Sequence, residues 1–225
     1  GDSGKLSHLC GLINATTFDI RAACTGFITA MACANEMLKD GYAIIVGADA
    51  MSRTLDWSDR NTCTLFGDAC GACVVQYTET NCFKYNLNTN GQDHNCITQN
   101  FECNSTTLTS GAYSKFKMDG PSVFTNAIKR ATESVSNLLL DFEIDKDGID
   151  AFVFHQANSR ILKVIAKELD LPHDKVIQNN EFNGNTSAAS IPLALDEHDV
   201  LSKSNKVVCC AFGAGFQSGC IYFET

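Results

Sequence analysis

Short apolar runs alternate with longer stretches of helical periodicity along this chain of 225 residues. Runs rich in β-branched or aromatic residues, each of a length suited to one buried strand, occupy residues 42–46, 150–154, 175–178, 206–212 and 216–223. Helical patterns fill much of the space between these runs. Strands that alternate with helices are typical of an α/β protein whose sheets are covered on both faces, so we expect that fold class.

Two segments of the chain resemble each other. Residues 18–31 and 182–195 both run from an apolar residue through a small polar turn into an Ala-rich helix. The first turn presents Cys24 and the second presents Asn185. Such an internal echo is a sign of duplication within a fold.

The ends and the middle of the chain are patterned differently. Residues 1–14 carry Leu6, Leu9 and Leu12 at helical spacing, which predicts the end of a helix whose beginning is absent from this sequence. Residues 76–117 are rich in Asn, Thr and Ser and only weakly patterned. We expect them to form a variable surface or cap region rather than core.

Composition excludes several classes of function. A net charge of −9 without any run of Lys and Arg argues against a nucleic-acid binder. No apolar run reaches the length of a membrane span, and the N-terminus lacks a signal-like pattern. Most of the twelve cysteines lie in apolar runs, and the C-x-x-C formed by Cys70 and Cys73 has no second pair at zinc spacing. We therefore expect no metal.

Cys24 is the first candidate for chemistry. Residues 16–22 have the composition of a buried strand, and an Ala-rich helix is predicted from the cysteine to Lys39. The amides and dipole at a helix N-terminus favour negative charge, so we expect them to lower the pKa of the thiol and to hold an oxyanion. A cysteine that simply fills space in the core is the alternative.

Two further candidates also have structural explanations. His155 directly follows the predicted strand at residues 150–154, where a hydrogen-bonded core histidine is common. Asn185 precedes a predicted helix, where asparagine is a favoured N-cap. The residues alone leave both readings open. His8, His94, His173 and His198 lack any such context and are expected at the surface.

Five blocks of sequence, in this order, resemble the β-ketoacyl-acyl carrier protein synthase III family. They read FDIRAACTGF around Cys24, VGADAMSRTLDWSDRNTCTLFGDACGA, FHQANSRI around His155, FNGNTSAASIPLAL around Asn185, and AFGAGFQSG. The resemblance covers nearly the whole chain outside residues 76–117. It implies a thiolase-like fold, a duplicated five-layered αβαβα architecture in which the first part of the N-terminal half is missing from this chain. Residues 1–115 would then complete that half and carry the cap, and residues 116–225 would form the C-terminal half.

The resemblance also implies a reaction. Cys24 resembles the nucleophile that accepts an acyl group, with acetyl-CoA the expected donor, and His155 and Asn185 resemble the pair that serves decarboxylation of malonyl-acyl carrier protein. The products would be β-ketoacyl-acyl carrier protein, CoA and CO2, at the start of type II fatty acid synthesis. Backbone amides at Cys24 and in the loop of Gly213, Ala214 and Gly215 would hold the oxyanion. No cofactor is implied.

Less specific matches concern the substrates. Trp57 and Arg60 resemble a CoA-binding position, and the alternative for Arg60 is an ion pair with Asp56 or Asp59 on the surface. Arg160, Lys163 and Lys167 share a predicted helix and would face acyl carrier protein. The positions that match the lining of the family's acyl pocket, which core packing explains equally well, are Phe66, Met118 and Phe212.

The family implies a homodimer, located in the cytoplasm of a bacterium or in the plastid stroma of a eukaryote.

Three rival functions remain. Polyketide synthases of the chalcone synthase type share the Cys, His and Asn set, but their closing motif usually contains Pro, which residues 212–216 lack. A thiol acyl hydrolase would use His155 as a base on Cys24. A degenerate, non-enzymatic relative would be expected to have lost one of the three residues.

Overall fold

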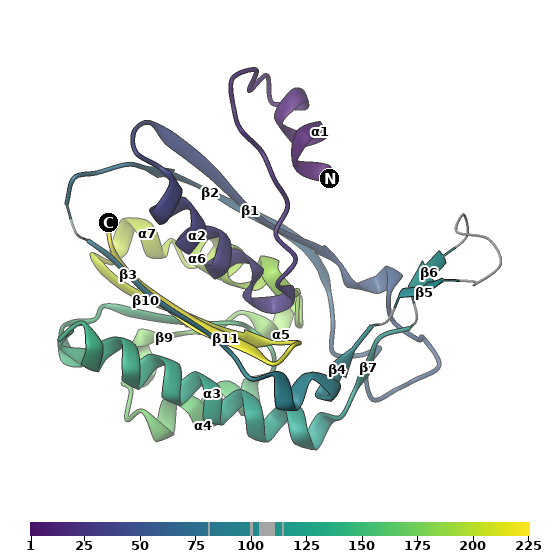
Figure 1. Ribbon diagram of the computed structural model, residues 1–225. Coiled ribbons are helices and arrows are strands. Elements are labelled where there is room, and N and C mark those ends of the chain that lie inside the picture. Colours follow the sequence, from purple (N-terminus) through teal and green to yellow (C-terminus); the bar gives the residue numbers. More distant parts are fainter. Residues whose placement is uncertain (81, 100, 104–110, 114) are drawn as a thin grey trace.

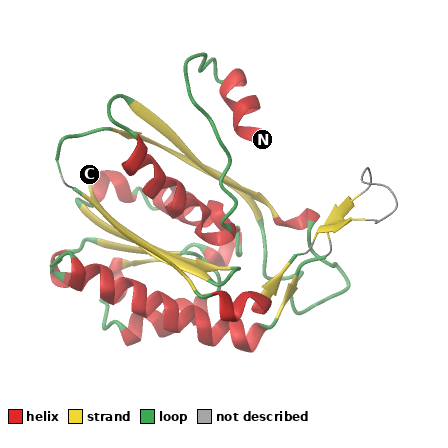
Figure 2. Ribbon diagram, in the orientation of Figure 1, coloured by secondary structure: helices red, strands yellow, loops and turns green. Residues whose placement is uncertain are grey.

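A computed structural model describes residues 1–80, 82–99, 101–103, 111–113 and 115–225. Its main elements stack as alternating layers of helices and sheet (Figures 1 and 2). The layers comprise, in order, helices α3 (Gly120–Asp141) and α4 (Ser159–Glu168), a five-stranded sheet, helices α2 (Gly26–Met37) and α6 (Ser190–Glu197), and the hairpin of β1 (Tyr42–Ala50) and β2 (Asp68–Gln76). Helix α1 (Asp2–Leu9) lies apart from the stack.

The five-stranded sheet is mixed. In spatial order the strands are β3 (Phe83–Thr89), β11 (Gln217–Glu224), β10 (Lys206–Gly213), β8 (Ala151–Phe154) and β9 (Val176–Ile177). Strand β10 pairs in parallel with β8 and antiparallel with β11, while β8 is parallel to β9 and β11 is antiparallel to β3. The shorter elements are β4 (Ile97–Thr98) paired with β7 (Lys117–Met118), β5 (Phe101–Cys103) paired with β6 (Gly111–Tyr113), α5 (Asn180–Asn183) and α7 (Val200–Lys203).

Each face of this sheet carries its own hydrophobic core. Side chains alternate between the two faces of a strand, so Phe152 and Phe154 of β8 pack toward α3 and α4, whereas Ala151 and Val153 pack toward α2 and α6. All four are buried. A strand buried on both faces reads as a continuous apolar run, which is why the sequence predicts β8 well.

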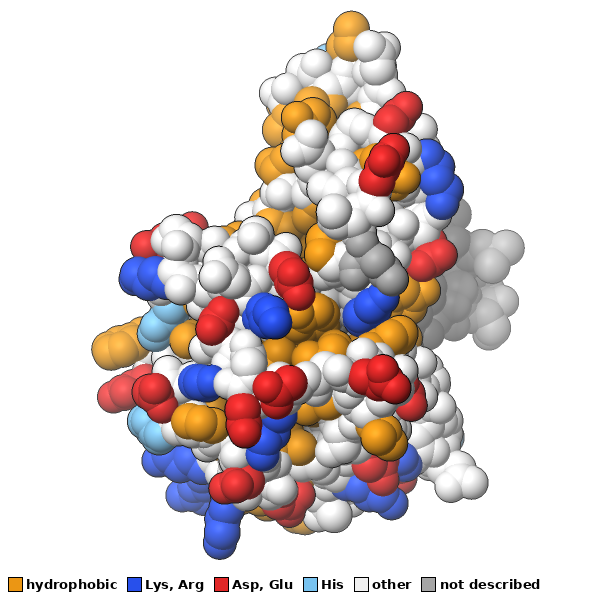
Figure 3. All heavy atoms as spheres, turned by 90° about the vertical axis from the view of Figure 1, so that its left-hand side faces the viewer, with side chains coloured by type: hydrophobic (Ala, Val, Ile, Leu, Met, Phe, Trp, Pro, Cys, Tyr) orange, Lys and Arg blue, Asp and Glu red, His pale blue; other side chains and the backbone are white. Residues whose placement is uncertain are grey.

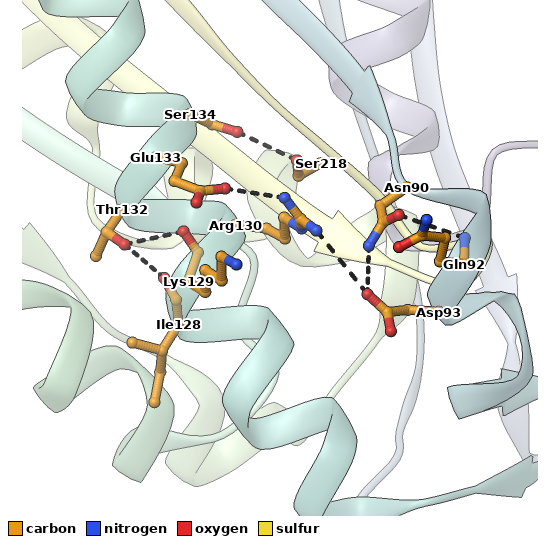
Figure 4. A network of polar contacts seen from close by, with 10 residues as sticks. All are labelled: Asn90, Gln92, Asp93, Ile128, Lys129, Arg130, Thr132, Glu133, Ser134 and Ser218. Carbon is orange, nitrogen blue, oxygen red and sulfur yellow. Dashed lines mark hydrogen bonds and ion pairs between the residues drawn. The ribbon is translucent and has the colours of Figure 1, made fainter.

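Helix α3 begins with a capped first turn, where Asp119 accepts hydrogen bonds from the backbone and hydroxyl of Ser122. Figure 4 shows the polar contacts of Arg130 in α3: its guanidinium pairs with Asp93, outside the helix, at 3.9 Å and with Glu133 of the same helix at 3.0 Å. The hydroxyl of Ser134 in the same helix bonds to Ser218 of β11. Because the Arg130 pairs are partly exposed, we expect the apolar stripe of α3 to contribute more stability.

The structure confirms the internal duplication. A 3-10 helix, η1 (Ala23–Thr25), precedes α2, and another, η6 (Ser187–Ala189), precedes α6. The first residues of η1, α2 and β1 correspond to the first residues of η6, α6 and β10 with a constant shift of 164 positions. The backbone conformation is also similar at equivalent positions, because φ is +46° at Ala23 and +53° at Ser187. The turns that lead into α2 and α6 are therefore equivalent in the two halves.

Most predicted elements are present, and two predictions are wrong. Residues 16–22 form no strand, because they are largely exposed and pair with no strand among the described residues. Residues 83–89, predicted as surface, form β3 and complete the five-stranded sheet. Strand β3 precedes the division predicted at residue 115, yet it belongs to the sheet of the second half.

Candidate active site

Cys24, His155 and Asn185 line one cavity of about 2130 Å³. They come from three different places: Cys24 from η1 at the start of α2, His155 from the end of β8, and Asn185 from the turn before η6. The duplicated arrangement brings the two helix starts together, since η1 packs against η6 and β10. Tertiary structure thus gathers the three predicted residues, which are as far as 161 positions apart in the chain.

Cys24 is partly buried, and its surroundings raise rather than lower the pKa of its thiol. Burial is the main cause and brings the pKa to about 11, with a smaller contribution from the carboxylate of Asp49. A hydrogen bond from Ser187 acts in the opposite direction. The predicted lowering is therefore wrong, because the loss of water around the thiol outweighs the favourable amides.

His155 is 1% exposed, and its Nδ1 atom lies 2.7 Å from the hydroxyl oxygen of Ser190. That oxygen also accepts a hydrogen bond from the backbone N–H of Gln156, at 3.3 Å. Because its oxygen already accepts this bond, we assign the hydroxyl of Ser190 as the donor to Nδ1 of His155. Nδ1 is then the acceptor, and the imidazole hydrogen lies on Nε2. Burial lowers the pKa of His155 to about 3, so the ring is neutral at physiological pH.

Asn185 is held by both its backbone and its side chain. The backbone forms a β-bridge beside Phe66, with its N–H donating to Leu65 at 2.9 Å and its carbonyl accepting from Gly67 at 3.0 Å. Its side-chain Oδ1 accepts the N–H of Ser187 at 2.9 Å. Within the described part of the chain, the side-chain NH2 group of Asn185 makes no hydrogen bond and remains able to donate.

Gly213 lies directly against Cys24. A Cβ atom at this position would lie 2.8 Å from Cys24 Cβ, 3.2 Å from Sγ and 3.4 Å from the backbone nitrogen. Any larger residue would therefore crowd the thiol and the amide beside it. Ala214 and Gly215, in the turn between β10 and β11, line the same cavity. The position of this loop agrees with the oxyanion role that the family resemblance implies.

The three predicted residues of the acyl pocket, Phe66, Met118 and Phe212, all line the cavity. The ring of Phe212 meets the imidazole of His155 edge-on, with centroids 5.4 Å apart. Phe116, which the sequence did not single out, also lines the cavity and stacks edge-on against Phe66 with centroids 4.9 Å apart. Aromatic side chains thus form part of the wall near the reactive groups.

The residues predicted to bind CoA lie elsewhere. Neither Trp57 nor Arg60 lines the cavity, and the indole of Trp57 is 65% exposed, with its N–H bonded to the carbonyl of Ser52. In the part of the chain that the structure describes, no salt bridge joins Arg60 to Asp56 or Asp59. The structure therefore does not support the simple ion pair as an explanation of Arg60.

The predicted basic positions of α4 are all exposed. Arg160, in its first turn, also lines the cavity, whereas Lys163 and Lys167 do not. On the face shown in Figure 3, acidic and basic side chains are interspersed around a hollow with apolar side chains. His8, His94, His173 and His198 are exposed, and His94 is one of the residues that line the cavity.

Sequence reasoning missed Ser187, Ser190 and Asp49, which support the three predicted residues. Asp49 accepts the N–H of Ala188 at 3.0 Å and so holds the start of η6. The signal for the two serines lay in the NTSAAS segment, where hydroxyls follow Asn185 at short spacing.

Among the described residues no cluster of His, Cys, Asp or Glu has the arrangement of a metal site, and none of the described helices is long and apolar enough to cross a membrane.

A duplicated fold with Cys, His and Asn on one cavity defines a thiolase-like condensing enzyme. Two models of one family match the chain: 3-oxoacyl-[acyl-carrier-protein] synthase III at residues 18–91, and the C-terminal part of the same synthase at residues 140–225. The chain belongs to the 3-oxoacyl-[acyl-carrier-protein] synthase III family. It is an acyltransferase of the condensing type that starts fatty acid synthesis.

Named relatives agree with this assignment. The β-ketoacyl-[acyl-carrier-protein] synthase III of Porphyra umbilicalis is 40% identical, with 100% of this chain and 73% of the relative covered. That of Trichodesmium erythraeum is 36% identical, with 100% and 72% covered. The crystal structure of the synthase III from Pseudomonas aeruginosa matches with a TM-score of 0.88 at 31% identity and covers 99% of this chain and 71% of its own. These matches confirm the thiolase-like fold.

Proposed function

We propose that Cys24 takes the acyl group from an acyl-CoA, with acetyl-CoA as primer. The thiolate attacks the thioester carbonyl, and the tetrahedral intermediate collapses with loss of the CoA thiolate, which leaves acyl-Cys24. The N–H groups of Cys24 and of the loop at Gly213 would stabilise the oxyanion. The close approach of Gly213 to Cys24 supports this role.

In the second step, malonyl-acyl carrier protein loses CO2 and leaves an enolate in the cavity. Nε2–H of His155 and the side-chain NH2 of Asn185 stabilise the enolate oxygen as neutral donors. The enolate carbon then attacks the carbonyl of acyl-Cys24, a carbon–carbon bond forms, and the bond to sulfur breaks. The products are β-ketoacyl-acyl carrier protein and the free thiolate of Cys24.

One observation carries this assignment: each donor is held through its other polar atom. Ser190 engages Nδ1 of His155, and the N–H of Ser187 engages Oδ1 of Asn185, so that Nε2–H and NH2 are the groups left to serve the cavity. Burial keeps His155 neutral, with a pKa of about 3. A neutral donor stabilises an enolate without protonating it, which decarboxylative condensation requires.

Separating the two half-reactions tests the proposal. Cys24→Ser should abolish transfer of label from acyl-CoA to protein, whereas His155→Ala and Asn185→Ala should retain that transfer and lose CO2 release from malonyl-acyl carrier protein. A lost oxyanion-type donor costs about 100- to 1000-fold in rate. If either Ala variant lost acylation as completely as Cys24→Ser, His155 would be the base for the thiol and a thiol acyl hydrolase would be the better reading.

The substrates need no cofactor in this proposal. Arg160 is exposed and lines the cavity, which supports a contact with acyl carrier protein at its mouth. Lys163 and Lys167, exposed on the same helix, would extend that contact. Trp57 and Arg60 remain proposed CoA contacts outside the cavity lining. The family models and the relatives favour this function over the polyketide synthases.

We also propose a homodimer. The β1–β2 hairpin exposes Tyr42, Ile44 and Val74 at 68%, 46% and 66%, and no strand of the described residues pairs with its outer edges. Uncovered edges and apolar side chains favour association. Light scattering of the enzyme at micromolar concentration should give twice the chain mass, and a monomer would contradict the proposal.

Relatives from cyanobacteria and red algae support the cytoplasm or the plastid stroma as the compartment.

A further inference from the structure

The hydroxyl of Ser187 lies 3.6 Å from Sγ of Cys24, in a geometry in which the hydroxyl donates. Ser187 is 4% exposed, so little water competes for this contact. Its backbone is fixed as well, because its own N–H donates to Asn185 and the next N–H, of Ala188, donates to Asp49. The hydroxyl is thus held in place by bonds that do not involve the thiol.

We propose that Ser187 is a further catalytic residue, whose hydroxyl donates the hydrogen bond that stabilises the Cys24 thiolate before attack and again when condensation releases it. The inference rests on the proposed role of Cys24 as the nucleophile. A donor to a charged acceptor stabilises it more than a neutral one, so the bond strengthens when the thiol ionises. Ser187 would therefore act on the reacting atom itself.

In the part of the chain that the structure describes, the other groups near Cys24 do not supply this donor. The hydroxyl of Thr25, the neighbour of Cys24, lies 2.7 Å from the carbonyl oxygen of Ala22 and 2.9 Å from Gln217 Oε1. Asp49 on β1 is a carboxylate, and its charge opposes ionisation of the thiol. His155, at the end of β8, is neutral, and in the described part of the chain its side-chain hydrogen bond goes to Ser190 rather than to Sγ of Cys24. Ser187 is thus the side chain that favours the thiolate in this environment.

The internal duplication provides a natural comparison. Ala23 occupies the position equivalent to Ser187, and both adopt a positive φ, of +46° and +53°. This conformation is disfavoured for residues with a side chain, yet alanine already adopts it in the first half. The backbone therefore does not require serine at position 187. It also follows that Ser187→Ala should fold with its local conformation intact.

The test is the pH dependence of Cys24 alkylation by iodoacetamide, followed by mass spectrometry of the peptide that contains Cys24. In Ser187→Ala the midpoint should move upward by about one pH unit, a tenfold loss of thiolate at neutral pH. Transfer of label from acetyl-CoA should fall by a similar factor. Ser134→Ala is the matched control, because it removes a buried hydroxyl that bonds to Ser218, and neither of these serines lines the cavity. Its alkylation profile should match that of the unaltered protein.

The outcomes are distinguishable. An unchanged midpoint in Ser187→Ala would overturn the inference, and so would equal shifts in both serine variants, which would indicate general loosening of the site. If the unaltered enzyme failed to place the acetyl label on Cys24 at all, the proposed function itself would be wrong. A shifted midpoint with normal thermal unfolding, confined to Ser187→Ala, supports the hydroxyl as the donor.

Discussion

Replacing Gly213 by alanine should disable Cys24 without removing the thiol. The added Cβ would lie 2.8 Å from Cys24 Cβ, whereas carbon atoms in contact are normally about 3.5–4.0 Å apart. Either the start of α2 or the end of β10 must therefore move by roughly 1 Å. A misplacement of that size at a reacting group costs on the order of 100-fold in rate. We expect a loss of that order in acyl transfer.

The assay is single-turnover transfer of label from acetyl-CoA to the enzyme, with thermal unfolding measured in parallel. Gly91→Ala, just after β3, is the matched control, because a Cβ there meets nothing within 4 Å and Gly91 does not line the cavity. It should acylate at the parent rate. If Gly213→Ala acylated within threefold of the parent and unfolded normally, the close approach of this glycine to Cys24 would not matter for catalysis.

Three further predictions concern protonation. Because burial raises the pKa of Cys24 to about 11, the thiolate fraction and the rate of Cys24 alkylation should rise about tenfold per pH unit between pH 7 and pH 10, and a plateau near pH 7 would contradict this. His155 has a pKa of about 3 when folded and about 6.5 when unfolded, so the unfolded chain binds the extra proton between these values. Stability should therefore fall as pH drops from 6.5 toward 3, and melting scans of His155→Gln should show a weaker fall than those of the parent. Ser190→Ala should no longer fix the ring tautomer and should slow CO2 release from malonyl-acyl carrier protein by about twofold while sparing acylation, since an even mixture of tautomers keeps the Nε2 donor in about half of the molecules; equal loss in both assays would contradict a role in the tautomer.

Local pattern was sufficient for much of the fold. Strand β8 and helix α3 were predictable because a strand buried on both faces and a helix with a proline-containing first turn carry their signals within a few residues. The two wrong predictions, for residues 16–22 and for β3, also come from reliance on local pattern. Residues 16–22 have strand-like composition, but a strand needs a partner for its backbone, and the described residues provide none. Strand β3 was not predicted because its Asn and Thr residues do not give the apolar pattern of a strand. It is a strand because its backbone pairs with β11.

By itself, the sequence determined which residues are available for chemistry and where elements begin: Cys24 at a helix start, His155 after a buried strand, and Asn185 before the second, equivalent helix. Tertiary structure alone decided how these groups behave. The contact of Cys24 with Ser187 joins residues 163 positions apart, and the burial that raises the thiol pKa comes from elements of both halves. Helix and strand signals depend on near neighbours in the chain, whereas desolvation and hydrogen bonding depend on whichever atoms surround a group in space.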